Sequence, residues 1–318
     1  MKNSIPSGVV QFFEPLSSLR RSTENSLIEF FKDNSYKEIV TPSFSYENGI
    51  SSGLFEPLKT KLFKLIDKSS GQTMILRADI TMQIMQAVLM GDFDMPARIC
   101  YADNIYRDIK EHSGQKREFK QVGVELLGIK EKTADNEIIN LSIESLRKFD
   151  IKDITVRISD TYIFERLFEK YGLNDSKKTK KIKGFLEKKN ISLILKSITE
   201  LPNNFIDNLK RLETLSGYVK KNNDYYNDVL DIAQDAIDTA KKIQSDNKDI
   251  KVFLDLFYCE HPMYHHGITF SVFSENRSLV VGGRYGNVTK PFGKYIPATG
   301  FAINLDELIY FLSNKEKK

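Results

Sequence analysis

The chain has 318 residues, of which 41% are hydrophobic and 28% are charged, a balance typical of a soluble globular protein with one or two domains. Its two cysteines, Cys100 and Cys259, argue against a disulfide framework and for a reducing compartment. No apolar run reaches the length of a membrane span, and the N-terminus lacks the apolar core of a signal peptide. We therefore expect a cytoplasmic protein without a membrane partner.

The formal net charge of +4 is a weak signal, because a dedicated nucleic-acid binder concentrates basic charge on one face. One basic cluster stands out, and it comprises Lys177, Lys178, Lys180, Lys181, Lys183, Lys188 and Lys189. A solvated helix face explains these lysines better than an RNA contact does. We expect no nucleic-acid partner.

The first third of the chain alternates helical and extended patterns. Residues 15–34 carry leucine and phenylalanine at largely helical spacing, and residues 36–44 predict a strand that ends at Pro42. A hairpin over residues 61–79 and a helix from about Ile80 to Met90 follow. Next, Arg98–Gly128 predicts two antiparallel strands joined by a long polar loop.

Beyond this hairpin, the sequence predicts an amphipathic helix over residues 136–149 and a short strand over residues 154–159. Residues 171–249 are rich in lysine and asparagine, and we interpret them as a mainly helical insertion. Strand signals resume at residue 252, a hairpin covers residues 268–283, and a strand runs into a helix over residues 298–312. Antiparallel strands with helices packed against them predict an α+β fold.

The second strand of the long hairpin has one apolar and one polar face, because successive side chains of a strand point to opposite sides. The apolar face comprises Val122, Val124 and Leu126. Gln121 and Glu125 lie on the polar face. Gly123 between them has no side chain, and we expect the space above it to be an empty floor between the two polar groups. Such a polar cradle suits an ammonium group and other hydrogen-bond donors.

Arg107, where the first strand enters the loop, adds a cation that suits a carboxylate or a phosphate. The alternative interpretation is an ordinary hairpin with a solvated polar face.

This hairpin resembles motif 2 of the class II aminoacyl-tRNA synthetases. Its amino-acid sequence is closest to those of the histidyl enzymes and of their non-catalytic relatives, the regulatory subunits of ATP phosphoribosyltransferase. The helix over residues 15–34 and the strand after it resemble motif 1, which builds the dimer interface in that family. The stretch from Gly282 to Leu308 resembles the closing part of the fold with motif 3.

The resemblance implies an antiparallel sheet flanked by helices, formed by residues 1–170 and 250–318 around the helical insertion at residues 171–249. It also implies that the separate anticodon-binding domain of the synthetases is absent, since only a short charged tail follows the motif 3-like helix.

The segment LRADIT, residues 76–81, resembles the signature of the regulatory subunits. In the family the acidic residue and the threonine, here Asp79 and Thr81, help to hold the ammonium group of the amino acid. Asp79 is equally well placed to cap the following helix. Both roles coexist if one carboxylate oxygen caps the helix and the other faces the pocket.

Three of the four histidines lie in the segment Cys259–His266, which invites a zinc-site interpretation. Adjacent histidines in a strand face opposite sides, and no second pair of ligands lies at suitable spacing, so we expect no metal site. The resemblance instead aligns Tyr264 and His265 with the loop that closes over histidine in the family. Tyr285 matches a tyrosine that lines the amino-acid pocket.

Two glutamates depart from the synthetase motifs. Glu260 stands where the family has an arginine four residues before the tyrosine of the loop, and Glu307 stands where motif 3 has an ATP-binding arginine. Both changes reverse the charge at positions that handle phosphate groups. The resemblance therefore implies a protein that has lost adenylation and needs no cofactor.

The function that the resemblance implies is that of a regulatory subunit, which activates short-form ATP phosphoribosyltransferase in the first step of histidine biosynthesis and senses histidine. Its expected partners are the short-form catalytic subunit and a second copy of the chain, held through the motif 1-like region. Two alternatives remain open: a truncated synthetase-like ligase that activates an amino acid, and a diverged paralogue that binds another ligand.

Overall fold

The computed structural model describes residues 4–50, 56–91, 93–110, 114–173, 203–219, 231–257, 265–286, 289–290 and 293–315. The chain divides into two compact units, one formed by residues 1–130 and 286–318 and the other by residues 131–285. Among the described residues, no helix combines the length and the apolar character that a membrane crossing requires.

The first unit contains a sheet in which the strands follow the order β1-β5-β6-β12. These strands are β1 (Lys37–Glu38), β5 (Ala97–Tyr106), β6 (Glu118–Leu127) and β12 (Ala298–Asn304). Strand β1 is parallel to β5, and the other neighbours are antiparallel. A smaller antiparallel sheet has the order β2-β4-β3, with strands Phe44–Tyr46, Thr73–Leu76 and Lys64–Ile66.

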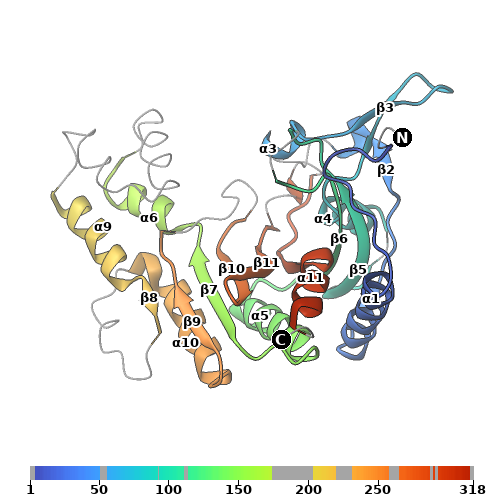
Figure 1. The fold of residues 1–318 in the computed structure, drawn as a ribbon. Helices are drawn as coiled ribbons and strands as arrows, with labels where there is room; N and C mark the ends of the chain where they lie inside the picture. The colour runs from blue at the N-terminus through green and yellow to red at the C-terminus, as the bar shows by residue number, and fades with distance from the viewer. Residues whose placement is uncertain are drawn as a thin grey trace. The chain divides into compact units, whose positions relative to one another are not determined.

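The described helices of this unit are α1 (Leu16–Asp33), α2 (Glu47–Ile50), α3 (Glu56–Lys59), α4 (Thr81–Met90) and α11 (Leu305–Lys315). Helices α1 and α11 pack against the β5–β6–β12 part of the sheet (Figure 1). The rings of Phe31 on α1 and Phe301 on β12 lie 5.7 Å apart, and Arg20 Nε donates to Asp306 Oδ1 at 2.8 Å. Burial of this apolar layer stabilises the unit.

The predicted alternation along β6 is confirmed on the apolar side. Val122, Val124 and Leu126 are fully buried. Val124 lies beside Phe301 in the register of β6 and β12, on the side covered by the two helices. The polar face of β6 therefore points to the opposite side of the sheet, where the candidate site lies.

The second unit contains strands in the order β11-β10-β7-β9-β8. They are β7 (Ile154–Asp160), β8 (Gly217–Tyr218), β9 (Lys251–Leu254), β10 (Ile268–Ser274) and β11 (Arg277–Arg284). Glu275 and Asn276 form the turn between β10 and β11 with φ of 47° and 64°, the left-handed conformation that tight hairpin turns use. The hairpin predicted over residues 268–283 is thereby confirmed.

The described helices of the second unit are α5 (Lys132–Arg147), α6 (Ile163–Lys170), α9 (Asn203–Leu215) and α10 (Gln234–Asp246), with a short 3₁₀-helix, η2, at Asp231–Ala233. The expected insertion at residues 171–249 contains α9, η2 and α10 in its described part, together with β8. Its lysine cluster lies outside the described residues, and its proposed boundaries remain a prediction.

The strand predicted over residues 36–44 is shorter than the pattern indicated. Between residues 36 and 42 only Lys37–Glu38 forms a strand, and Ile39 N adds one further hydrogen bond to Cys100 O; Phe44 already belongs to β2. Pro42 has no N–H to continue the pairing, and the carbonyl of Thr41 accepts a hydrogen bond from the guanidinium of Arg77 instead. The end of this strand is therefore determined by a tertiary contact.

Candidate functional site

The segment that connects β4 to α4 is held against strand β5 by the buried side chain of Arg77, which is 5% exposed. Its Nε donates to the carbonyl of Asn104 at 2.6 Å, and its Nη2 donates to Asp103 Oδ1 at 2.6 Å. Its Nη1 donates to the carbonyl of Thr41 at 2.7 Å. This clamp places residues 79–81 beside the polar face of the hairpin.

Thr81 and Glu125 meet directly at this position. Thr81 Oγ1 donates to Glu125 Oε1 at 2.6 Å, and the two residues are 8% and 2% exposed. Asp79 Oδ1 accepts the backbone N–H of Met82 at 3.2 Å, in the first turn of α4. The predicted capping role of Asp79 is confirmed, although Ile80 stands between it and the first helical residue.

Tyr101 is part of this cluster and was missed by the sequence analysis. It lies opposite Gly123 in the β5–β6 register and is 2% exposed. Burial raises the pKa of the Tyr101 hydroxyl well above its ordinary value, and the charges of Glu125 and Asp79 act in the same direction. The hydroxyl therefore stays protonated at physiological pH.

The expectation of an empty floor at Gly123 was wrong, because the ring of Tyr101 occupies that space. A Cβ atom at Gly123 would lie 2.6 Å from Tyr101 Oη, closer than any normal contact. The signal that could have revealed this is the hairpin register, which places the aromatic side chain of Tyr101 directly opposite Gly123. That register depends on the length of the loop, which the side-chain pattern leaves open.

Gly300 makes room for the carboxylate of Glu125 in the same way. The two residues are direct partners in the β12–β6 register. A Cβ atom at Gly300 would overlap Glu125 Oε2 and the carbonyl of Val124. This glycine therefore serves the packing of a buried carboxylate rather than an unusual backbone conformation.

Arg107 and Gln121 lie at the same side of the hairpin. Arg107 Nε donates to the carbonyl of Ala78 at 3.2 Å, which places the guanidinium next to the Asp79 segment, and its charge lies 5.4 Å from the ring centre of Phe119. Gln121 is half-buried, two residues before Gly123 on the polar face. The first unit thus brings together five of the predicted site residues, and these are Asp79, Thr81, Arg107, Gln121 and Glu125.

The remaining predicted site residues belong to the second unit. His265 and Tyr285 are 6% and 2% exposed there, and a Cβ atom at Gly283 would lie 2.9 Å from His265 Nδ1. Tyr264 and Glu260 lie outside the described residues, as does most of the histidine-rich segment. Among the residues that the structure does describe, no three His, Cys, Asp or Glu side chains are arranged to hold a metal ion.

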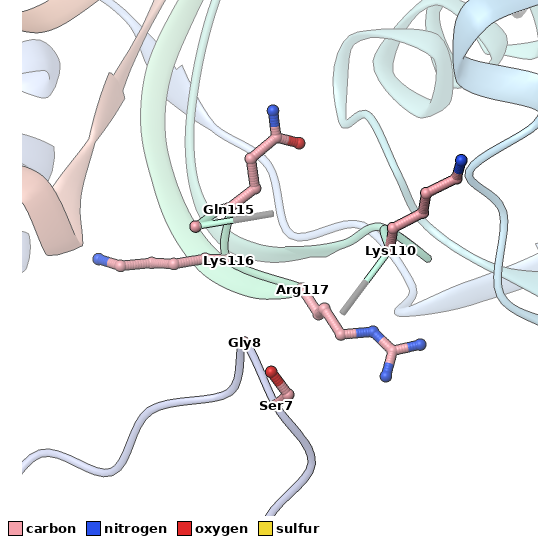
Figure 2. Close-up of a pocket in the computed structure, with 7 residues that line it drawn as sticks. Ser7, Gly8, Lys110, Gln115, Lys116 and Arg117 are labelled. Atoms are coloured by element: carbon pink, nitrogen blue, oxygen red, sulfur yellow. The ribbon is translucent and has the colours of Figure 1, made fainter. Parts of the chain in front are cut away.

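A basic pocket of about 250 Å³ lies where the N-terminal segment meets the hairpin loop (Figure 2). Its lining residues are Ser7, Gly8, Lys110, Gly114, Gln115, Lys116 and Arg117. Figure 2 shows that the charged ends of the two lysines and the arginine point in different directions. The cations therefore do not converge on one point as they would around a single bound phosphate.

Two of these cations are paired with carboxylates. Lys116 Nζ lies 3.0 Å from Glu307 Oε1 and 4.8 Å from the ring centre of Tyr310. Arg117 forms an ion pair with Asp108 and stacks over Phe63. Glu307, which replaces the arginine expected from motif 3, is thus half of an ion pair within the first unit.

The chain is similar to known proteins in sequence and in fold. A family model described as histidyl-tRNA synthetase matches residues 8–308. The chain is 31% identical to an ATP phosphoribosyltransferase regulatory subunit from Thermoanaerobacter pseudethanolicus, across 98% of this chain and 84% of that relative.

Two solved structures share the fold. One is a regulatory subunit/histidyl-tRNA synthetase from Bacillus halodurans, with a TM-score of 0.83, 24% identity, and coverage of 98% of this chain and 84% of that one. The other is the HisG:HisZ ATP phosphoribosyl transferase complex from Thermotoga maritima, with a TM-score of 0.69 and 17% identity. The match covers 90% of this chain and 97% of that one. The predicted α+β fold, a class II synthetase-like sheet flanked by helices, is confirmed.

Replacing Arg77 with methionine should destabilise the protein by about 3–5 kcal/mol, because it leaves Asp103 and two buried carbonyls without their donor. Urea-induced unfolding measures the change. Arg277→Met, at an exposed position in β11, is the matched control and should change the unfolding free energy by less than about 0.5 kcal/mol. Equal effects of the two substitutions would contradict the clamp.

Gly123→Ala should destabilise the protein by about 1–3 kcal/mol, because the new methyl group would overlap both the backbone carbonyl of Phe301 and the buried Tyr101 ring. The control is Gly217→Ala in β8, where a Cβ atom meets nothing within 4 Å. Thermal unfolding of both variants tests the packing. A Gly123→Ala protein as stable as the control would show that neither the ring nor the Phe301 carbonyl packs against this glycine.

Proposed function

This chain belongs to the histidyl-tRNA synthetase family, with the regulatory subunits of ATP phosphoribosyltransferase among its relatives, and from this premise we propose that it is such a subunit. In this role it activates the short-form catalytic subunit in the first step of histidine biosynthesis, and it binds histidine as the feedback signal. The proposal places it in the cytoplasm.

The observation that carries the sensing part is the cluster of Asp79, Thr81 and Glu125 on the polar side of the hairpin. Asp79 and Glu125 accept hydrogen bonds with their carboxylate oxygens, the Thr81 hydroxyl donates to Glu125, and Arg107 supplies a cation beside them. An amino acid carries an ammonium group and a carboxylate on one carbon atom, which matches acceptors next to a guanidinium. Gln121 lies on the same face of β6 and completes this cluster of the first unit.

The absence of adenylation activity is proposed from the charges at two positions. The carboxylate of Glu307 forms an ion pair with Lys116. Its negative charge repels a triphosphate, and the ion pair neutralises a nearby cation that could otherwise bind one. Glu260 adds a second negative charge by sequence, at the position where the family has an arginine that stabilises phosphate charge. An enzyme that forms an adenylate needs cations at the developing phosphate charge, and removing one costs about 3–4 kcal/mol of transition-state stabilisation.

Histidine can act as a signal only if it binds two states of the complex with different affinity. We propose that the two states of the complex differ in how the catalytic subunit contacts this chain. We further propose that two copies of the chain form a dimer through α1 and β1, the region that resembles motif 1.

The test is the initial rate of phosphoribosyl-ATP formation by the short catalytic subunit of the same organism, titrated with this protein. We expect the rate to rise and to saturate near equimolar protein, and histidine to reverse the rise. Co-elution of the two proteins on size-exclusion chromatography is the supporting measurement. No rise in rate and no co-elution would remove the proposal.

The ligase alternative has its own assay, which is histidine-dependent exchange of pyrophosphate into ATP. We expect no exchange above background, because negative charges occupy the two phosphate-binding positions. Exchange at a rate typical of a synthetase would favour the ligase.

A further inference from the structure

A turn over residues 6–9 places the N-terminal segment against the end of the hairpin loop. Val9 N donates to the carbonyl of Pro6 at 3.3 Å, and Gly8 in this turn has a φ of 79°. Glycine adopts such a φ readily, whereas a residue with a side chain is strained there. The carbonyl of Gly8 accepts the backbone N–H of Arg117 at 2.7 Å (Figure 2). The turn therefore holds the residue at which β6 is entered.

A second backbone hydrogen bond carries this contact across the hairpin. Arg107 directly follows β5, and Arg117 directly precedes β6. Arg107 N donates to the carbonyl of Arg117 at 2.8 Å. The backbones of Gly8, Arg117 and Arg107 are thus joined in one row, and two hydrogen bonds separate the N-terminal turn from Arg107.

The side chain of Arg107 is held by a different neighbour than its backbone. Its Nε donates to the carbonyl of Ala78 at 3.2 Å, and its guanidinium lies 5.4 Å from the ring centre of Phe119. These contacts direct the cation towards the segment that carries Asp79. A shift of the Arg107 backbone would therefore move the cation relative to the polar cluster.

The contact between the turn and the loop has no room for a side chain at Gly8. A Cβ atom there would lie 2.8 Å from Cγ of Arg117, a distance that Cβ atoms do not show in folded proteins. It would also lie 3.1 Å from the backbone N of Arg117 and 3.2 Å from the carbonyl oxygen of Gln115. Since two of these neighbours are backbone atoms, a methyl group at Gly8 must push the turn and the loop apart.

Helix α11 anchors both partners of this contact. The ring of Tyr310 lies 5.8 Å from the ring of Phe12, and Lys116 Nζ lies 4.8 Å from the ring centre of the same tyrosine. We call residues 6–12 the N-terminal strap. The strap is fastened to the hairpin at Gly8 and to α11 at Phe12, so its position relative to the loop is fixed at two points.

We propose that the N-terminal strap is a positioning element for ligand binding: through Gly8 and the backbone of Arg117, it holds Arg107 where its guanidinium binds the carboxylate of the amino acid. A guanidinium binds a carboxylate best through two parallel N–H donors, so a small displacement weakens the pair. The inference rests on the proposed histidine site and adds to it a segment that acts through Arg107.

The competing explanation is that the strap only stabilises the fold, and Gly8→Ala separates the two when two ligands are compared. Histamine is histidine without its carboxylate, so its binding does not use this role of Arg107. We expect Gly8→Ala to bind histidine about ten-fold more weakly by isothermal titration calorimetry, and to bind histamine within about two-fold of the wild-type affinity. A general loss of folded protein would weaken both ligands alike.

The matched control is Gly71→Ala, in the turn between β3 and β4. Gly71 has a φ of 71°, close to that of Gly8, and a Cβ atom there meets nothing within 4 Å. The two substitutions therefore introduce similar backbone strain, and only the one at Gly8 presses on the hairpin loop. Gly71→Ala should leave the affinities for histidine and histamine unchanged. Urea unfolding of each variant confirms that it is folded under the conditions of the titration.

Two further variants test the route through Arg107. In an Arg107→Met background the carboxylate has already lost its cation, and there Gly8→Ala should change the histidine affinity by less than about two-fold. Phe12→Ala removes the ring that fastens the strap to Tyr310. It should weaken histidine binding and spare histamine binding, and it takes the place of Gly8→Ala if that variant does not fold.

The outcomes separate the inference from the function on which it rests. If the wild-type protein binds histidine and the strap variants bind it equally well, or lose histidine and histamine affinity to the same extent, the positioning role is overturned and the proposed function stands. Equal wild-type affinities for histidine and histamine would also overturn it. If the wild-type protein binds no histidine, the inference falls together with the sensing role, while activation of the catalytic subunit is judged by its own rate assay.

Discussion

The site depends on one buried guanidinium. Arg77 donates hydrogen bonds to Thr41, Asp103 and Asn104, and so joins three segments that are distant in the sequence. A buried charge is stable only when its donors are matched, and here two backbone carbonyls and two side-chain oxygens supply the acceptors. The position of the Arg77 guanidinium determines where α4 begins, and therefore where Asp79 and Thr81 lie.

A second layer of hydrogen bonds extends the clamp into α4. Thr41 Oγ1 donates to Gln83 Oε1 at 2.7 Å, and Gln83 Nε2 donates to the carbonyl of Pro42 at 2.8 Å. The start of the helix is thus tied to the same loop that Arg77 holds. A site supported in this way is organised before a ligand arrives, which lowers the entropic cost of binding.

The parts of the fold that the sequence predicted well are those with a long periodic signal. Helix α1, the alternation of β6 and the turn at Glu275 and Asn276 each depend on neighbours in the chain. The early end of β1 was not predicted, because it depends on Arg77, which lies more than thirty residues away. Tyr101 was missed for the same reason, since its partner Gly123 is assigned by the register of the hairpin. Asp79, Thr81, Arg107, Gln121 and Glu125 were found through family motifs, and their roles remain proposals.

The central claim is that this polar cluster recognises the ammonium group of an amino acid. The most direct measurement compares, by isothermal titration calorimetry, the affinity of the protein for histidine with that for imidazolepropionate, which is histidine without its α-amino group. We expect histidine to bind at least about ten-fold more tightly, because hydrogen bonds from a charged donor to buried acceptors are lost in the analogue. Equal affinities for the two compounds would contradict the claim.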